Sequence, residues 1–114
     1  GISKTVVFAP FHSNYRLANA NTARITAQYP DRLLGFAFVH AQRDRGQIHS
    51  MIAEAVDRWR FCGIKVHRLD GPLTREICDV AQKFRVPLLY DPVGQTDIID
   101  LLAPQYPQVN LLLS

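Results

Sequence analysis

Residues 33–67 read LLGFAFVHAQRDRGQIHSMIAEAVDRWRFCGIKVH, and this stretch decides the predicted fold. Its two ends, Leu33–His40 and Gly63–His67, are nearly continuous apolar runs, typical of strands that are buried on both faces. Between them, Ile48–Trp59 places apolar residues three and four positions apart, which predicts a helix with one face toward a core. A strand, a helix and a second strand in this order indicate a parallel β-α-β unit.

The same alternation continues toward both ends of the chain. Further apolar runs predict strands at Lys4–Ala9, Val86–Asp91 and Val109–Leu113. Good helix formers or helical stripes predict helices at Arg16–Gln28, residues 73–84 and Asp97–Ala103, with Thr74 or Asp70 as the candidate cap of the second of these. The sequence therefore predicts consecutive parallel strand–helix units of the type (βα)4β, in the α/β class.

Two architectures fit this order of elements. One is a flavodoxin-like open sheet, which would make the chain a binding or regulatory domain without catalysis. The other is part of a TIM barrel, a fold that needs about 250 residues when complete, whereas this chain has 114. The chain stops directly after an apolar strand that no helix follows, and such an edge invites association. We therefore expect residues 1–114 to form one partial barrel domain that self-associates or oligomerises through exposed sheet edges.

Composition narrows the classes of partner. The chain is 47% hydrophobic and 20% charged, with a net charge of +3 and no basic run longer than two residues. A nucleic-acid partner is not expected, because such surfaces cluster their basic residues, and no apolar stretch approaches the ~20 residues of a membrane span. Cys62 and Cys78 form no CxxC motif, so free thiols in a reducing, cytoplasmic compartment are expected.

Ionisable residues gather where the predicted strands end. His12 follows the first strand, His40 and His67 end the second and third, and Asp91 ends the fourth. The carboxyl ends of parallel strands meet at one rim, where α/β folds place their chemistry. Imidazole and carboxylate are ligands for zinc, which can activate a bound water, and the same groups can act as general acid or base without a metal.

The third predicted strand carries a second ionisable group. Lys65 and His67 are two residues apart, so their side chains share one face. A lysine on a buried strand is costly unless it is paired or functional, and we predict that Lys65 and His67 are catalytic. Arg68 directly follows them and is a candidate for binding a substrate carboxylate, although a solvated loop position is its simpler interpretation.

The other rim residues have structural interpretations as well. His12 and His40 are predicted to line the substrate pocket, but His12 could simply hydrogen-bond its own loop and His40 could be a satisfied pocket residue. Asp91 precedes a proline, where an aspartate often shapes a turn. His49 lies in a helix whose apolar stripe is elsewhere, so a surface position is expected for it.

Four segments in series resemble one known family. They are YPDRLLGFAFVH (Tyr29–His40), FCGIKVHR (Phe61–Arg68), VPLLYDPVG (Val86–Gly94) and QYPQVNLLLS (Gln105–Ser114), with Asn19 ahead of the first. Their order and spacing resemble the amidohydrolase-related family of TIM-barrel metal-dependent hydrolases, which includes aminocarboxymuconate-semialdehyde decarboxylase. The resemblance covers nearly the whole chain.

The resemblance implies a function for a longer protein. It implies a metal-dependent hydrolase or decarboxylase that acts on a small organic substrate bearing a carboxylate. It places the chain at strands two to six of the barrel, so that most of the family's metal ligands would lie outside it and the chain alone would be inactive. The family commonly has a histidine ligand after the fourth strand of this chain, where Asp91 stands instead. Because carboxylate can replace imidazole, Asp91 is the expected ligand of a divalent metal, most simply zinc.

Overall fold

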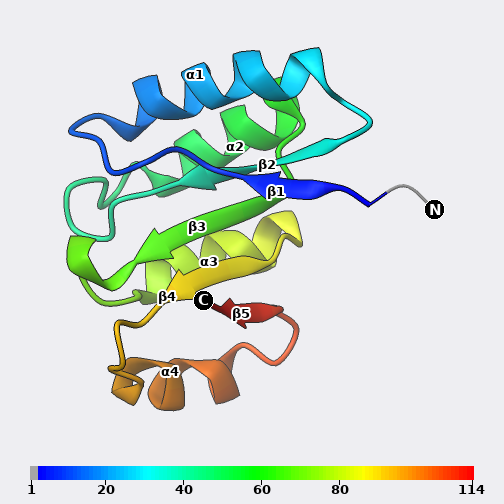
Figure 1. Cartoon of the computed structure of the whole chain (residues 1–114). Helices are drawn as coiled ribbons and strands as arrows, with labels where there is room; N and C mark the ends of the chain where they lie inside the picture. The colour runs from blue at the N-terminus through cyan, green and yellow to red at the C-terminus, as the bar shows by residue number, and fades with distance from the viewer. Residues whose placement is uncertain (1–2) are drawn as a thin grey trace.

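The computed structural model describes residues 3–114 and contains one parallel sheet of five strands (Figure 1). The strands lie side by side in chain order: β1 (Thr5–Val7), β2 (Leu33–Phe38), β3 (Gly63–His67), β4 (Leu88–Asp91) and β5 (Leu111–Leu113). A flavodoxin-like sheet would instead have the order 2-1-3-4-5. The curled sheet with alternating helices confirms the predicted α/β partial barrel, and nothing in it favours the open-sheet alternative.

The helices follow the predicted pattern with small shifts at their ends. They are α1 (Tyr15–Gln28), α2 (Ile48–Trp59), α3 (Arg75–Phe84) and α4 (Asp97–Leu102), with short 3-10 turns at Arg68–Asp70 and Ala103–Gln105. Figure 1 shows that they flank the strands on the outside of the curl. Thr74, rather than Asp70, caps α3, because its hydroxyl accepts a hydrogen bond from the Ile77 N–H at 3.3 Å.

The two faces of the sheet have different roles. Ile64, Val66, Leu88 and Tyr90 are fully buried, as expected for side chains between the sheet and the helices. The alternate positions point to the concave face, where Phe38, Lys65 and Leu89 form one row in register across β2, β3 and β4. The concave face therefore combines apolar and ionisable side chains, and His67 and Asp91 form its next row.

Asn19 joins α1 to β2 inside the core. Its amide Nδ2–H donates to the Phe38 carbonyl and its Oδ1 accepts the Phe38 N–H, both at 2.9 Å. The β1–β2 pairing extends only to the pair Val7 and Gly35, so Phe38 lies beyond its reach. The Asn19 amide thus supplies the two hydrogen bonds that a longer β1 would have made.

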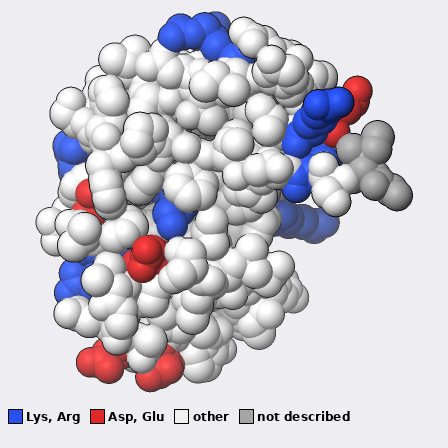
Figure 2. Space-filling view, viewed as in Figure 1, with Lys and Arg blue, Asp and Glu red and all other residues white. Residues whose placement is uncertain are grey.

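The edges and the surface bear on possible partners. Leu112 and Leu113 on β5 are 40% and 53% exposed, and Val6 on β1 is 39% exposed. Self-association through these edges stays a prediction. On the face shown in Figure 2, Lys and Arg are scattered and most of the surface carries no charged side chain. Among residues 3–114, no helix is long and apolar enough to cross a membrane.

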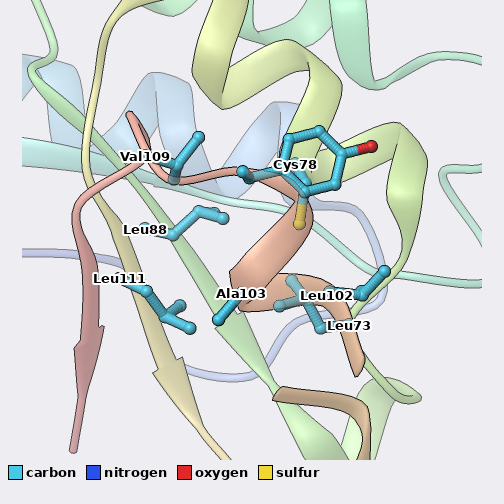
Figure 3. A pocket seen from close by; sticks show the side chains of 8 residues that line it. Leu73, Cys78, Leu88, Leu102, Ala103, Val109 and Leu111 are labelled. Carbon is cyan, nitrogen blue, oxygen red and sulfur yellow. The ribbon is translucent and has the colours of Figure 1, made fainter. Parts of the chain in front are cut away.

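A small apolar cavity lies between α3, α4 and the end of the sheet (Figure 3). Its volume is about 20 Å³, the space of roughly one water molecule. It is lined by Leu73, Cys78, Leu88, Leu102, Ala103, Tyr106, Val109 and Leu111. Burial raises the pKa of the Cys78 thiol to about 11, so this cysteine is part of the core rather than a reactive group.

The two thiols should therefore react at different rates. At pH 8 a thiol with a pKa near 11 is ionised in about one molecule in a thousand, and Cys78 is buried whereas Cys62 is only partly covered. We expect iodoacetamide to label Cys62 in the folded protein well before Cys78, and both equally in urea. Peptide mapping over time measures this, and equal native rates would contradict the packing of α3 against the sheet.

Candidate active site

His67 and Asp91 form a close pair at the carboxyl ends of β3 and β4. The two residues are register partners, and His67 Nε2 lies 3.2 Å from Asp91 Oδ2. His67 Nδ1 accepts a hydrogen bond from the Leu69 N–H at 3.1 Å, so the neutral imidazole carries its proton on Nε2, facing the carboxylate. The other Asp91 oxygen, Oδ1, accepts from the Val93 N–H at 3.0 Å, which fixes the orientation of the carboxylate. This pair can hold and transfer a proton.

Lys65 lies one row deeper on the same face. Its side chain is 4% exposed, and its ammonium group donates to the Ser114 hydroxyl at 3.3 Å. The nitrogen lies 4.9 Å from the centre of the Phe8 ring. Burial lowers the pKa of Lys65, and the negative charge of Asp91 opposes this only in part. Lys65 therefore has a larger neutral fraction than a surface lysine.

Aromatic rings stand beside these ionisable groups. Phe11, in the loop after β1, meets the His67 ring edge to face at 4.8 Å between centroids. It also lies 5.9 Å from Phe38, which in turn lies 6.1 Å from Phe8. Phe8, Phe11 and Phe38 thus make an apolar wall beside Lys65 and His67, of the kind that ligand pockets combine with a few polar groups.

A second cluster joins three loops at the same rim. The Tyr15 hydroxyl, at the start of α1, donates to Asp70 Oδ2 at 2.6 Å. His40 Nε2 lies 3.7 Å from Asp70 Oδ1, and His40 Nδ1 accepts from the backbone N–H groups of Gln42 and Arg43. Tyr15 is 1% exposed and stacks on Phe38 at 4.3 Å, and burial, reinforced by the bond to Asp70, raises its pKa. The cluster ties the loops after β1, β2 and β3 together.

Arg43 adds a further tie between two of these loops. Its guanidinium donates to the His12 carbonyl at 2.9 Å and lies 5.1 Å from the centre of the Tyr15 ring. The loop that carries Phe11 is therefore held on its C-terminal side, by Arg43 at His12 and by the hydrogen bond from Tyr15 to Asp70. We infer that these contacts position Phe11 against His67.

Removing the Tyr15 hydroxyl should weaken the link between the start of α1 and the turn after β3, because that hydroxyl donates to Asp70. Tyr15→Phe leaves a part-buried carboxylate without its donor, and a hydrogen bond to a charged group contributes about 1.5–3 kcal/mol. We expect the free energy of unfolding in urea to fall by about 2 kcal/mol. Tyr106→Phe is a matched control, because the Tyr106 hydroxyl also donates to an aspartate, Asp79, at 2.6 Å, but at the surface. Tyr106→Phe should lower the free energy of unfolding by less than about 1 kcal/mol. Equal losses of stability in the two variants would contradict the structural role given to the hydrogen bond from Tyr15 to Asp70.

The structure also places the other residues that the sequence analysis singled out. His12 Nδ1 accepts from the Asn14 N–H at 2.8 Å, which matches the structural interpretation of this residue. Arg68 lines a surface hollow with Pro72 and residues 94–98. His49 is exposed, as predicted. The roles of His12, His40 and Arg68 toward a substrate stay predictions. Sequence reasoning missed Tyr15, Arg43 and Phe11, and it considered Asp70 only as a cap.

The described part of the chain offers few ligands that could share one metal ion. Within residues 3–114, no three His, Cys, Asp or Glu side chains cluster so as to hold a metal ion. Asp91, the expected ligand, supplies one donor side chain, whereas a zinc site takes three or four protein ligands. The residues present therefore fit a part of a metal site and not a complete one.

Several solved structures share the fold of this chain. No protein-family model matches the sequence, and no curated protein matches it. A protein from Staphylococcus aureus assigned as an amidohydrolase superposes on 87% of the chain with a TM-score of 0.63 and 15% identity. The chain therefore has the fold of one part of this structure. 2,6-Dihydroxybenzoate decarboxylase from Rhizobium matches 87% of the chain (TM-score 0.62, 20% identity), and 4-oxalomesaconate hydratase from Rhodopseudomonas palustris matches 94% (TM-score 0.65, 16% identity).

The chain spans less than half of each of these structures. It covers 46% of the protein from Staphylococcus aureus, 43% of the decarboxylase and 42% of the hydratase. At 15–20% identity, what the chain shares with these structures is the fold of its strands and helices.

Proposed function

We propose that the chain forms part of the catalytic barrel of an amidohydrolase-type enzyme, a hydrolase or decarboxylase acting on a small organic substrate that bears a carboxylate. The observation that carries the proposal is the convergence of Lys65, His67 and Asp91 on the concave face, with His67 Nε2 3.2 Å from Asp91 Oδ2. Ionisable groups at the carboxyl ends of parallel strands, beside an apolar wall, are typical of active sites. The solved decarboxylase and hydratase of the same fold support the enzyme class.

In this proposal the residues have separate roles. The His67–Asp91 pair holds a proton at His67 Nε2 and delivers it to, or takes it from, the reacting group. Phe8, Phe11 and Phe38 exclude water from the site, and Lys65 contacts the substrate. His12, His40 and Arg68 are the candidates for substrate binding.

A divalent metal, most simply zinc, is part of the proposal for a longer protein. Asp91 is the residue of this chain that would bind it, and other parts of a full barrel would supply the remaining ligands. A bound zinc ion would supply an activated water near neutral pH. Metal analysis of the longest form that can be expressed tests this part of the proposal.

The experiment for the function compares two histidines. The longest form is assayed against a panel of small aromatic and aliphatic organic acids and lactones, together with His67→Gln and His49→Gln. Loss of a general acid–base group costs about 10²–10⁴ in rate, so His67→Gln should lower kcat/KM at least about 100-fold. His49 is exposed on α2, and its variant should keep the rate of the parent protein. Equal rates for both variants would overturn the proposed role of His67.

A further inference from the structure

The sheet has two free edges, one at β1 and one at β5. In the part of the chain that the structure describes, β1 pairs with β2 alone and β5 pairs with β4 alone. The two edge strands have the same length, three residues each. Apolar side chains are exposed on both, Val6 at 39% on β1 and Leu113 at 53% on β5. A strand edge with unpaired backbone groups and apolar side chains is a template for pairing with another chain.

The hydrogen bonds of the sheet show which backbone groups face outward at each edge. The Thr5 N–H donates to a carbonyl on the β2 side, so the next N–H along β1, that of Val6, points away from β2 toward the free edge. The Ser114 N–H donates to a carbonyl of β4, so the N–H of the residue before it, Leu113, points away from β4. Val6 and Leu113 therefore each present a donor to a strand outside this sheet.

The two edges of the sheet carry opposite charge. Residues 1–30, which include β1 and α1, contain three Lys or Arg and no Asp or Glu, whereas residues 86–114, which include α4 and β5, contain three Asp and no Lys or Arg. Five of these six charged side chains are exposed: Lys4, Arg16, Arg24, Asp97 and Asp100. In the view of Figure 2, basic atoms lie over α1 at the top and acidic atoms over α4 at the bottom. The β1 edge thus has a net charge of +3 and the β5 edge a net charge of −3.

Apolar side chains accompany these charges on the helices beside each edge. A groove of about 270 Å³ lies between β1 and α1, and its mainly apolar walls include Phe8 and Ile25. Ile25 is 53% exposed and directly follows Arg24, while Leu101 on α4 is 56% exposed and directly follows Asp100. Each edge therefore offers exposed apolar surface next to a charge that is opposite in sign to the charge of the other edge.

We propose that a second copy of this chain pairs its β1 edge with the β5 edge of the first, so that the two sheets join head to tail. Unlike edges attract each other, whereas two β1 edges or two β5 edges would bring charges of the same sign together. With all helices on one side of the joined sheet, β5 and the second copy's β1 run parallel, as all neighbouring strands within the sheet do. The contact is heterologous, because different surfaces of the two copies meet.

The inference goes beyond the proposed function, since it needs neither a substrate nor a metal. It concerns residues 1–114 as a separate chain. In a longer barrel the same two edges would pair with that barrel's own strands, so the test uses the chain of 114 residues.

Proline at the outward-facing N–H of each edge strand tests which edges meet. Proline removes that donor, and an edge strand tolerates it where the nitrogen faces solvent. Val6→Pro therefore blocks the β1 edge and Leu113→Pro blocks the β5 edge, and circular dichroism checks that each variant folds. In sedimentation velocity we expect dimers or larger species for the unmodified chain and monomers for either variant alone. An equal mixture of the two variants should form a dimer, because each supplies the edge that the other lacks.

Three outcomes of this experiment would overturn the inference. An unmodified chain that stays monomeric at every concentration makes no such contact. A variant that still dimerises alone pairs like edges, through β5 in Val6→Pro or through β1 in Leu113→Pro. A mixture of the two variants that contains no dimer shows that the β1 and β5 edges do not meet.

A charge reversal decides the same question while both edge strands stay intact. Arg24→Glu changes the charge of the β1 edge from +3 to +1, and the dissociation constant of the complex should rise about fivefold. Lys83→Glu is the matched control, because it changes the net charge of the chain equally but lies exposed on α3, away from both edge strands. Pairing of two β1 edges would become tighter in Arg24→Glu. A lower dissociation constant in Arg24→Glu, or equal effects of the two variants, would therefore contradict head-to-tail pairing.

Discussion

Replacing Asp91 with asparagine is expected to lower the turnover of the longest form by about 100-fold or more, the usual cost of losing an acid–base partner. The substitution keeps the size of the side chain and the Oδ1 acceptor for the Val93 N–H, but removes the charge 3.2 Å from His67 Nε2. The imidazolium that forms during proton transfer would lose its stabilising carboxylate. If Asp91 also binds metal, the metal content of the purified protein should fall in parallel.

An exposed aspartate provides the control for this measurement. Asp97, in the first turn of α4, is exposed, and Asp97→Asn should keep turnover and metal content. The assay is kcat/KM beside elemental analysis of the same preparations. Unchanged turnover and metal content in Asp91→Asn would remove Asp91 from the site.

The second large effect is expected at Asn19, and on stability rather than activity. Asn19→Ala leaves the buried N–H and carbonyl of Phe38 without partners, since both bond to the Asn19 amide. An unsatisfied buried polar group costs about 1–3 kcal/mol. We expect the free energy of unfolding to fall by about 2–4 kcal/mol, measured by urea denaturation followed by circular dichroism.

Asn21 is the matched control on the same helix. Its side chain is only partly buried and accepts from Arg24 at the surface. Asn21→Ala should change stability by less than about 0.5 kcal/mol, as surface substitutions usually do. A cost for Asn19→Ala no larger than that of Asn21→Ala would mean that water replaces the amide at Phe38.

The fold could be predicted from the sequence because local signals and topology agree. Apolar runs such as Gly63–His67 and the helical stripe of Ile48–Trp59 fix the alternation of strands and helices, and alternation implies parallel strands. The strand ends were less predictable. The apolar run predicted a strand from Val109 to Leu113, but β5 begins at Leu111, where its pairing with Leu88 of β4 starts. Where such a strand begins depends on its contacts with the neighbouring strand, which the local sequence does not show.

The candidate site was predicted in part, for a similar reason. Strand ends meet at one rim, so the closeness of His67 and Asp91 followed from the sequence pattern. The hydrogen bond from Tyr15, the first residue of α1, to Asp70, in the 3-10 turn after β3, joins residues 55 positions apart. No periodicity in the sequence determines how the segments around them fold. The only sequence signal for Asp70 was a carboxylate shortly after the third strand, and that signal also fits a helix cap.

The most direct test of the central claim is an experimental structure of the longest form of the protein. The proposed amidohydrolase-type barrel predicts that further strands pair with β1 and β5 and close the barrel, so that Lys65, His67 and Asp91 line one enclosed pocket on its inner face. A structure in which β1 and β5 stay unpaired edges, or in which these three side chains face an open surface, would contradict the account.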